Sequence, residues 1–293
     1  MHVIRPSQRT PSTPRLALVL GSGGVRSVAA IGIAECLARE GIAPDLVVGC
    51  SSGALFGATI ALRMASDEAL AMATTLWSAE LTRQRRWRSY AQLVAPKIAG
   101  FDGAFAMRDD RLIADRIAQA FGEQRLEHLP TPLRVAATDA ASGQPVVLTR
   151  GRLVDALRAS IAVPFIFPSV EVDGRRLVDG VLSDPLPVGV ASDADLVIAL
   201  GFTGAMPRRV DRASRLVAQT STAMINNLMD ARVAAVRATG RPMLDIELQL
   251  DRHVGLWETA AMPHLFEAGR RAAEARLPEI VALLEHAAPR HAA

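Results

Sequence analysis

The strongest chemical signal in the sequence is a serine inside a glycine frame. Gly49-Cys50-Ser51-Ser52-Gly53 has the form G-x-S-x-G, in which the glycines relieve crowding around a nucleophile on a sharp, strained turn. A hydroxyl at the start of a helix lies among free N–H groups that favour developing negative charge. Cys50 is a rival nucleophile, but it lies off the centre of the frame. The pattern predicts Ser51 as a nucleophile toward ester carbonyls, against the alternative of a structural Gly/Ser-rich turn.

A second glycine-rich segment, Gly21 to Arg26, reads GSGGVR. Such a turn at a helix start offers backbone N–H groups to a phosphate or an oxyanion. A dinucleotide site is disfavoured, because Arg26 stands where the third glycine of G-x-G-x-x-G belongs and no acidic residue ends the next predicted strand. A Walker A loop would need Gly-Lys-Ser/Thr, which does not follow. An oxyanion is therefore the expected ligand of this segment.

The sequence offers two kinds of base for the serine. Asp179-Gly180 follows a predicted strand, although Asp-Gly is also a common turn pair. A Ser-His-Asp triad would instead need a suitably placed histidine. His253 and His264 follow Asp179 in the chain order of ordinary α/β-hydrolases, but no strand-to-loop pattern frames either of them. The other histidines are His2, His128, His286 and His291.

The elements around these motifs predict a parallel α/β sheet. Leu16 to Leu20 and Asp45 to Val48 are short apolar runs typical of buried strands. Val25 to Glu40 and Ser52 to Ala65 have the spacing of helices. Strand, helix, strand and helix in this order indicate parallel strands. Neighbouring strands would let the amides of Gly23 and Gly24 face the Ser51 hydroxyl and form an oxyanion hole.

The rest of the chain extends this pattern without a repeat or an interior linker. Further strands are predicted at Leu133 to Thr138, Gln144 to Leu148, Val170 to Leu177 and Leu196 to Leu200, and long helices at Arg212 to Thr239 and Met262 to His286. We predict a single α/β domain over residues 15–286 with a helical C-terminal part. Residues 1–14, rich in proline, predict a mobile N-terminal tail, and residues 287–293 a C-terminal tail.

Four separated motifs together resemble the patatin-like phospholipase family, in particular its small bacterial members. Gly23 to Arg26, Gly49 to Gly53, Ala159 to Pro168 and Asp179-Gly180 follow the order and spacing of the family's G-G-G-x-[KR]-G, G-x-S-x-G, A-S-x-x-x-P-x-x-F-P and D-G-[GA] motifs. The resemblance runs from about Leu16 to about Leu200.

This resemblance implies a three-layer α/β/α sandwich with a mainly parallel sheet, and a Ser-Asp dyad in place of a triad. Ser51 would be the nucleophile of an acyl-enzyme mechanism and Asp179 its base. The residues implied for the oxyanion hole are Gly23, Gly24, Val25 and Arg26. The implied substrate is a phospholipid or another acyl ester, with no cofactor or metal. The sequence departs from the family pattern at Ser22, Ser27, Val181 and Asp184.

The composition indicates a cytoplasmic protein. A formal net charge of +3 does not suggest a nucleic-acid partner. Two cysteines, Cys36 and Cys50, are too few for a disulfide framework and fit a reducing compartment. The apolar runs are shorter than the roughly 20 residues of a membrane span, so any membrane contact would be peripheral. The oligomeric state is left open.

The segment Leu81 to Met107 combines arginines with aromatic side chains, which suits an anionic lipid interface. Its residues of these types include Arg83, Arg85, Arg86, Trp87, Arg88, Tyr90, Phe101 and Phe105. We expect a mobile flap that meets a lipid surface and controls access to Ser51. The alternative is that the aromatic residues belong to the core and the arginines cover a solvated helix face.

Three interpretations of the function follow. The first is a lipid acyl hydrolase of the phospholipase A type. The second is a weakly active or inactive family member that binds lipid or a protein partner, as the changes at Ser27, Val181 and Asp184 would allow. The third is a general carboxylesterase that uses His253 or His264. A nucleotide-binding enzyme is the least favoured.

Overall fold

The computed structural model describes residues 14–82, 86–103, 105–207 and 209–287 of the 293-residue chain. Its strands are β1 (Leu16–Leu20), β2 (Leu46–Cys50), β3 (Leu133–Asp139), β4 (Pro145–Leu148), β5 (Val170–Val172), β6 (Arg175–Asp179), β7 (Leu196–Leu200) and β8 (Met243–Asp245). Its α-helices are α1 (Ala29–Arg39), α2 (Ser52–Ala61), α3 (Ser66–Leu76), α4 (Trp87–Val94), α5 (Pro96–Ala99), α6 (Arg111–Phe121), α7 (Leu153–Ser160), α8 (Ala213–Arg237) and α9 (Met262–Ala287). Short 3-10 helices are η1 (Gly24–Val28), η2 (Ala79–Thr82), η3 (Leu126–His128), η4 (Gly180–Leu182), η5 (Val188–Ala191) and η6 (Thr259–Ala261).

The strands form one sheet in the order β5-β6-β3-β2-β1-β7-β8, with β4 paired to β3 off this path. Five strands, β3, β2, β1, β7 and β8, run parallel to one another. β4 and β6 pair antiparallel with β3, and β5 pairs antiparallel with β6. Every residue of β1, β2 and β7 is buried, as expected for parallel strands covered on both faces. The prediction of a mainly parallel sheet is confirmed.

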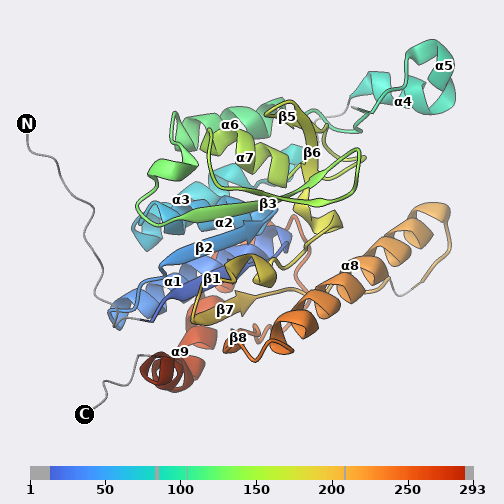
Figure 1. Cartoon of the computed structure of the whole chain (residues 1–293). Helices are drawn as coiled ribbons and strands as arrows, with labels where there is room; N and C mark the ends of the chain where they lie inside the picture. Colours follow the sequence, from blue (N-terminus) through green and yellow to red (C-terminus); the bar gives the residue numbers. More distant parts are fainter. Residues whose placement is uncertain (1–13, 83–85, 104, 208, 288–293) are drawn as a thin grey trace, which may run out of the picture.

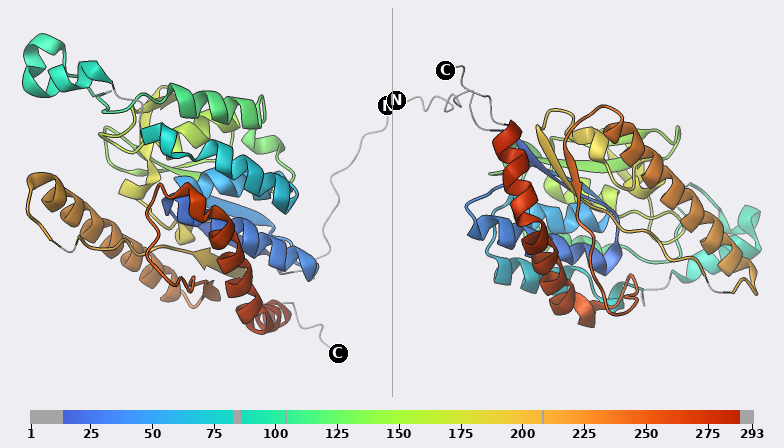
Figure 2. Two further views of the ribbon diagram at one scale, coloured as in Figure 1. Left: turned by 180° about the vertical axis from the view of Figure 1, so that it is seen from behind. Right: turned by 90° about the horizontal axis from the view of Figure 1, so that it is seen from below.

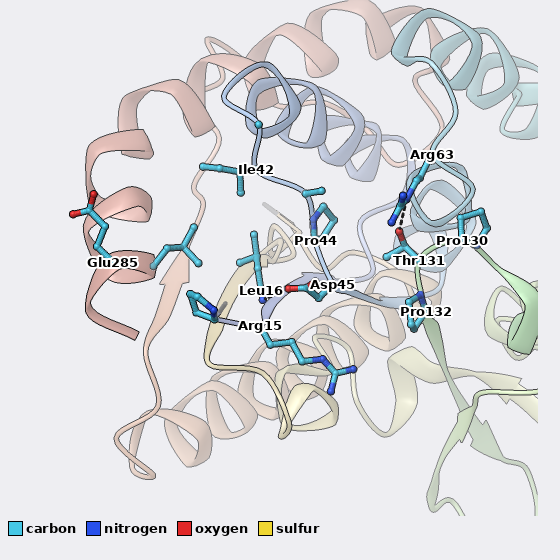
Figure 3. A pocket seen from close by; sticks show the side chains of 14 residues that line it. Arg15, Leu16, Ile42, Pro44, Asp45, Arg63, Pro130, Thr131, Pro132 and Glu285 are labelled. Carbon is cyan, nitrogen blue, oxygen red and sulfur yellow. Dashed lines mark hydrogen bonds between the residues drawn. The ribbon is translucent and has the colours of Figure 1, made fainter. Parts of the chain in front are cut away.

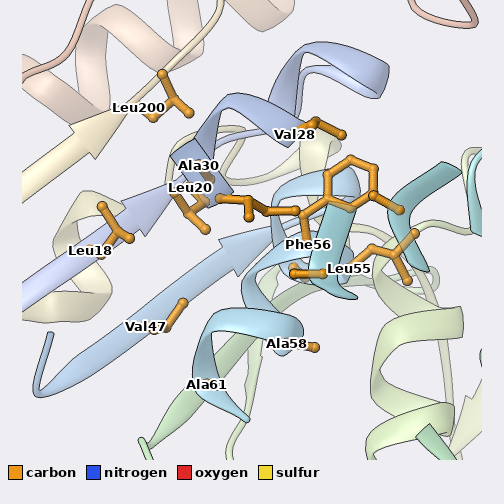
Figure 4. Packing of buried hydrophobic residues seen from close by; sticks show 14 of the residues in the cluster. Leu18, Leu20, Val28, Ala30, Val47, Leu55, Phe56, Ala58, Ala61 and Leu200 are labelled. Atoms are coloured by element: carbon orange, nitrogen blue, oxygen red, sulfur yellow. The ribbon is translucent and has the colours of Figure 1, made fainter. Parts of the chain in front are cut away.

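The side chains of β1 alternate between the two faces of the sheet, as strand geometry requires. Leu16, Leu18 and Leu20 pack into a core with α1, α2 and α9. Figure 4 shows Leu18 and Leu20 together with Leu55 and Phe56 of α2 in this core. Ala17 and Val19 pack into a second core with η5 and α8. Helices therefore cover both faces of the sheet (Figure 1), and the predicted three-layer α/β/α sandwich is confirmed.

Direct backbone contact joins α9 to α1. A Cβ at Gly32 would lie 2.0 Å from the carbonyl oxygen of Phe266, and a Cβ at Gly269 would lie 2.1 Å from that of Ala29. Any larger residue at either glycine would force the helices apart. The two long C-terminal helices therefore belong to different layers, because α9 packs on α1 and α8 covers the opposite face.

Most of the predicted elements are present, and β1 and β7 have the predicted bounds. The prediction of one strand over Val170 to Leu177 is wrong. The chain turns at Asp173 and Gly174, whose φ angles are 50° and 72°, and β5 and β6 pair as a hairpin. Asp-Gly suits such a tight turn. The sequence patterns did not predict α3, α6, α7 or β8.

Two helical arms extend beyond the sheet at the end toward which β2 points (Figures 1 and 2). One arm consists of α4 and α5, and the other is the N-terminal half of α8. Within the predicted flap, Arg83 and Arg85 lie outside the described residues, as does most of each predicted tail. The tails and the domain bounds stay predictions. No helix in the described parts of the chain is long and apolar enough to cross a membrane.

Candidate active site

Ser51 lies on a strained turn between β2 and α2. Its φ and ψ are 56° and −127°, a region that residues other than glycine rarely adopt. The frame glycines permit this turn. A Cβ at Gly49 would lie 2.4 Å from Ala54 Cα, and a Cβ at Gly53 would lie 2.4 Å from the Leu20 carbonyl oxygen. The strand-turn-helix geometry predicted for Ser51 is therefore present.

Strand β3 brings Ser51 and Asp179 together. β2 runs parallel to β3 and ends with Cys50 opposite Ala136, whereas β6 runs antiparallel to β3 and ends with Asp179 opposite Ala137. β4 pairs with β3 along both stretches and so occupies its other edge. β2 and β6 therefore lie end to end on one edge of β3, and their carboxyl ends meet.

Ser51 and Asp179 are in direct contact. Ser51 Oγ donates a hydrogen bond to Asp179 Oδ2 at 2.7 Å, and the N–H of Val181 donates to Oδ1 at 2.8 Å. Burial of the Asp179 carboxyl raises its pKa from 3.8 to about 7, although the bonds from Val181 and Ser51 lower it. An aspartate with a pKa near neutrality is a better proton acceptor than an ordinary one.

Cys50 has a packing role. Its thiol is buried with Ala136 and Val181, and its Sγ lies 4.0 Å from Asp179 Oδ1. Burial, followed by the negative charges of Asp179 and Asp184, raises the pKa of the thiol well above 9.0. Since the thiolate is the nucleophilic form of cysteine, Cys50 is a poor rival to Ser51.

The end of α7 fixes the backbone of both residues. The Ser51 N–H donates to Ser160 Oγ at 2.8 Å, and Ser160 Oγ donates to the Ala136 carbonyl oxygen at 2.7 Å. The Asp179 N–H donates to the Ala162 carbonyl oxygen at 3.0 Å. The sequence singled out the motif that contains Ser160 but assigned it no role. Its contacts show that it fixes the backbone of the turn that carries Ser51.

The GSGGVR segment lies beside Ser52, the first residue of α2. The Gly23 N–H donates to Ser52 Oγ at 3.2 Å. The Val25 N–H donates to the Leu256 carbonyl oxygen, and the Arg26 N–H donates to the Gly23 carbonyl oxygen at 3.3 Å. Gly24, with a φ of 58°, has no acceptor for its N–H among the described residues. Of the four residues predicted to line an oxyanion hole, Gly24 is thus the one with an available amide.

The family profile described as Patatin-like phospholipase matches residues 18–192, which is more than half of the chain. The chain belongs to the patatin-like phospholipase family. The matched residues include the GSGGVR segment, the nucleophile turn, the Ser160 motif and Asp179. They leave out α8 and α9.

Relatives with curated sequences are similar over the same region. An uncharacterized NTE family protein of Mycobacterium tuberculosis is 36% identical over 198 residues, which cover 67% of this chain and 51% of that protein. Patatin-like phospholipase domain-containing protein 7 of Rattus norvegicus is 30% identical over 189 residues, or 63% of this chain and 13% of that one. Among solved structures, VipD from Legionella pneumophila has a TM-score of 0.49 at 14% identity, covering 92% of this chain and 67% of that one. This chain spans about half or less of the curated relatives that it matches.

Ser27 stands where patatin-like phospholipases usually have a glycine, and its hydroxyl has clear partners here. Ser27 Oγ lies 2.9 Å from Ser52 Oγ and donates to the Gly21 carbonyl oxygen at 3.2 Å. Ser52 Oγ also accepts the Gly23 N–H. The two hydroxyls therefore tie α2 to both sides of the glycine-rich turn, and this departure from the family pattern holds the loop in place.

Ser22, another departure, donates its N–H to the Pro185 carbonyl oxygen at 3.0 Å. Two further departures, Val181 and Asp184, lie in the turn after Asp179. The Val181 N–H donates a hydrogen bond to Asp179 Oδ1, and the Val181 side chain is buried. Asp184 is also buried, and burial raises its pKa to about 6, against the opposing effect of Arg232. Arg232 Nε lies 3.9 Å from Asp184 Oδ1. This loose ion pair connects α8 to the Asp179 turn.

A segment beyond the family match supports the glycine-rich turn. The Leu256 carbonyl oxygen accepts the Val25 N–H at 3.0 Å and the Trp77 Nε1–H at 3.0 Å. Trp77 stacks on Trp257 with ring centroids 4.6 Å apart. Arg26 lies on the same turn, with its guanidinium carbon 5.0 Å from the centroid of the Phe202 ring. No sequence motif pointed to these contacts, because the residues are far apart in the chain.

The histidines with described positions lie on the surface and do not contact the dyad. They are His128, His253, His264 and His286; His2 and His291 lie outside the described residues. In the parts of the chain that the structure describes, no group of three or more His, Cys, Asp or Glu side chains could hold a metal ion.

A cavity of about 1010 Å³ lies at the other end of the sheet (Figure 3). Its walls include Leu16 at the start of β1, Asp45 just before β2 and Pro132 just before β3. Ligands of open parallel sheets bind beyond the carboxyl ends of the strands, where Ser51 lies. This cavity is therefore separate from the dyad.

Proposed function

We propose that this protein is a serine acyl-ester hydrolase of the phospholipase A type that acts on phospholipids or related esters through a Ser51-Asp179 dyad. The observation that carries the proposal is the 2.7 Å hydrogen bond from a serine on a strained turn to a buried carboxyl. Membership of the patatin-like phospholipase family supports a lipid ester as the substrate. A cytoplasmic location with peripheral membrane contact accompanies this proposal.

The dyad can carry out both halves of an acyl transfer. Asp179 Oδ2 accepts the Ser51 proton while Oγ attacks the ester carbonyl carbon. The tetrahedral intermediate then collapses, the leaving alcohol takes the proton from Asp179, and an acyl-enzyme remains. A water molecule next gives its proton to Asp179 and attacks the acyl carbon. Release of the fatty acid returns the proton to Ser51 Oγ.

The oxyanion of each intermediate needs donors that are already in place. The available N–H of Gly24 is one such donor, and the N-terminal amides of α2 lie next to Ser51. The hydrogen bonds of Ser27, Ser52 and Gly23 hold the loop against this helix terminus. Because these contacts are made within the protein, they would hold the donors in place as charge develops.

A fluorophosphonate probe tests the proposal directly. The wild-type protein should be labelled and should release fatty acid from phospholipid, whereas Ser51→Ala should do neither and keep its fold. Cys50→Ala should still be labelled, because the thiol is buried and protonated. Labelling of Ser51→Ala would show that another residue is the nucleophile. A folded wild-type protein that is neither labelled nor active would favour the lipid-binding alternative.

The carboxylesterase alternative makes a different prediction. If His253 or His264 were the base, replacing it by alanine would remove hydrolysis. Both side chains are exposed, and the dyad proposal expects His253→Ala and His264→Ala to hydrolyse esters at nearly the wild-type rate.

A further inference from the structure

Half of α8 lies outside the packed core. The buried residues of this helix are Met229 and Val236, both in its C-terminal half, whereas Leu216, Val217 and Met224 are 53%, 65% and 67% exposed. We call residues 209–224, the start of the helix and the residues before it, the α8 arm. Exposed apolar side chains that gather on one element are typical of an interaction surface.

The α8 arm projects from the neighbourhood of the dyad. Ile225, the next residue, packs against the buried cluster of Cys50, Ala136 and Val181. Further along α8, Arg232 donates to the Ser183 carbonyl oxygen at 2.9 Å. From this anchor beside the Asp179 turn, the arm runs outward on the same side of the molecule as α4 and α5 (Figures 1 and 2). A partner that covers the arm would therefore lie next to the catalytic residues.

The surface near the dyad is apolar as well. Phe165, Leu182 and Leu256 are 68%, 49% and 50% exposed, and each belongs to a segment that supports the catalytic geometry. The α4–α5 arm adds Val94 and Ile98, which are 87% and 91% exposed. The exposed apolar side chains thus come from several separate segments at one end of the molecule.

Cationic side chains accompany the apolar ones. The α8 arm contains three arginines and one acidic residue. Arg209 and Arg212 are exposed, and Arg215 pairs with Asp211 at 2.8 Å. Lys97 is exposed on the α4–α5 arm. The charge of the two arms is therefore complementary to an anionic partner.

We propose that the α8 arm, together with the α4–α5 arm and the apolar residues near the dyad, docks on an anionic phospholipid bilayer. A bilayer accepts apolar side chains from separate helices at headgroup depth without needing a matching shape, and its phosphates attract arginine. A protein partner would need one continuous complementary surface. The inference extends the proposed function, because the bilayer would present ester groups beside Ser51.

Vesicle co-sedimentation tests the docking surface. The full chain carrying Ser51→Ala keeps the lipid intact and should bind vesicles of phosphatidylcholine with added phosphatidylglycerol more tightly than phosphatidylcholine alone. Leu216→Ser with Val217→Ser should weaken binding at least about tenfold. Arg209→Gln and Arg212→Gln should each weaken it about fivefold at low salt and less at high salt. The matched control is Val281→Ser, which should bind like its parent. Val281 is a 38% exposed valine of α9, one helical turn before Leu284 in the wall of the distant cavity.

Several results would overturn the proposal. One is a chain that does not bind the anionic vesicles, and another is equal loss of binding in the arm variants and in Val281→Ser. A dimer in light scattering that Leu216→Ser and Val217→Ser dissociate would assign the surface to a second copy of the chain. With Ser51 intact, the arm variants should hydrolyse a small soluble ester at the wild-type rate. The membrane-docking proposal and the proposed esterase activity can therefore be disproved independently of each other.

Discussion

The dyad and the α8 arm differ in how strongly the fold constrains them. Ser51 and Asp179 are 7% and 0% exposed, and hydrogen bonds to α7 and its following turn hold the backbone of each. Residues 213–224 of α8 include no buried side chain. Proton transfer needs groups fixed within a fraction of an ångström, whereas contact with a fluid surface needs side chains that the core has not already covered.

The same two regions differ in their relation to the family. The match to patatin-like phospholipases covers the dyad and ends at residue 192, before α8 begins. Substitutions around the dyad should therefore change the rate of ester cleavage on every substrate. Substitutions on the arm should change only the use of aggregated lipid.

The largest effect should come from Asp179→Asn. The amide keeps the shape of the carboxyl but cannot accept the Ser51 proton, so we expect kcat to fall about 10³-fold or more. Hydrolysis of a small soluble ester is the measurement, with thermal unfolding as the control for folding. Activity within tenfold of wild type would show that Asp179 is not the base.

Ser160→Ala should have the next largest effect. The Ser51 N–H would lose its acceptor and the strained turn could relax, so kcat should fall about 10- to 100-fold with a smaller change in KM. Ser214→Ala, at an exposed position of α8, is the matched control and should match wild type on a small soluble ester. A defect confined to KM would mean that Ser160 shapes the substrate pocket instead of positioning Ser51.

The pH dependence should report the buried carboxyl. Because only ionised Asp179 can accept a proton and its pKa is about 7, kcat/KM on an uncharged soluble ester should fall about tenfold per pH unit below that value. A profile that stays flat down to pH 5 would mean that Asp179 has an ordinary pKa. The same profile measured on the arm variants should be unchanged.

The free energy of unfolding should fall as pH rises, whereas kcat/KM should rise. The unfolded chain releases the Asp179 proton near pH 4, whereas the folded chain keeps it to about pH 7. The free energy of unfolding should therefore fall as pH rises through this window, by on the order of 2–4 kcal/mol. Asp179→Asn removes this ionisation, so at pH 8 it should unfold at a higher denaturant concentration than wild type. At pH 4 the two proteins should differ little.

Much of the fold could be predicted because it depends on local patterns. The apolar runs of β1 and β7 match their bounds, and the glycine frame of Ser51 specifies a turn that other residues would block. The hairpin after Val170 was missed, because one strand was assigned across Asp173 and Gly174 although Asp-Gly is a common turn pair. The supports from Ser160 and Leu256 depend on contacts between distant segments. No spacing along the chain contains that information.

The amides of the glycine-rich loop show the same limit. The motif correctly indicated where a loop would lie beside α2, but it could not indicate which N–H groups remain available. Their availability depends on distant acceptors: Ser52 Oγ accepts the Gly23 N–H, and the Leu256 carbonyl oxygen accepts the Val25 N–H. Likewise, the spacing of apolar residues predicted α8 as a helix, but it could not show that only the C-terminal half packs.

The smallest effect should come from Met224→Ala, and a second methionine on the same helix provides its control. Met224 is 67% exposed and Met229 is 8% exposed in the core beside η5. Met229→Ala should lower the free energy of unfolding by about 2–4 kcal/mol, whereas Met224→Ala should change it by less than about 0.5 kcal/mol. Urea unfolding of both variants measures the contrast. If Met224→Ala were as destabilising as Met229→Ala, the α8 arm would be packed in solution. The arm would then resemble the dyad region in packing, and it could not serve as a free surface for lipid.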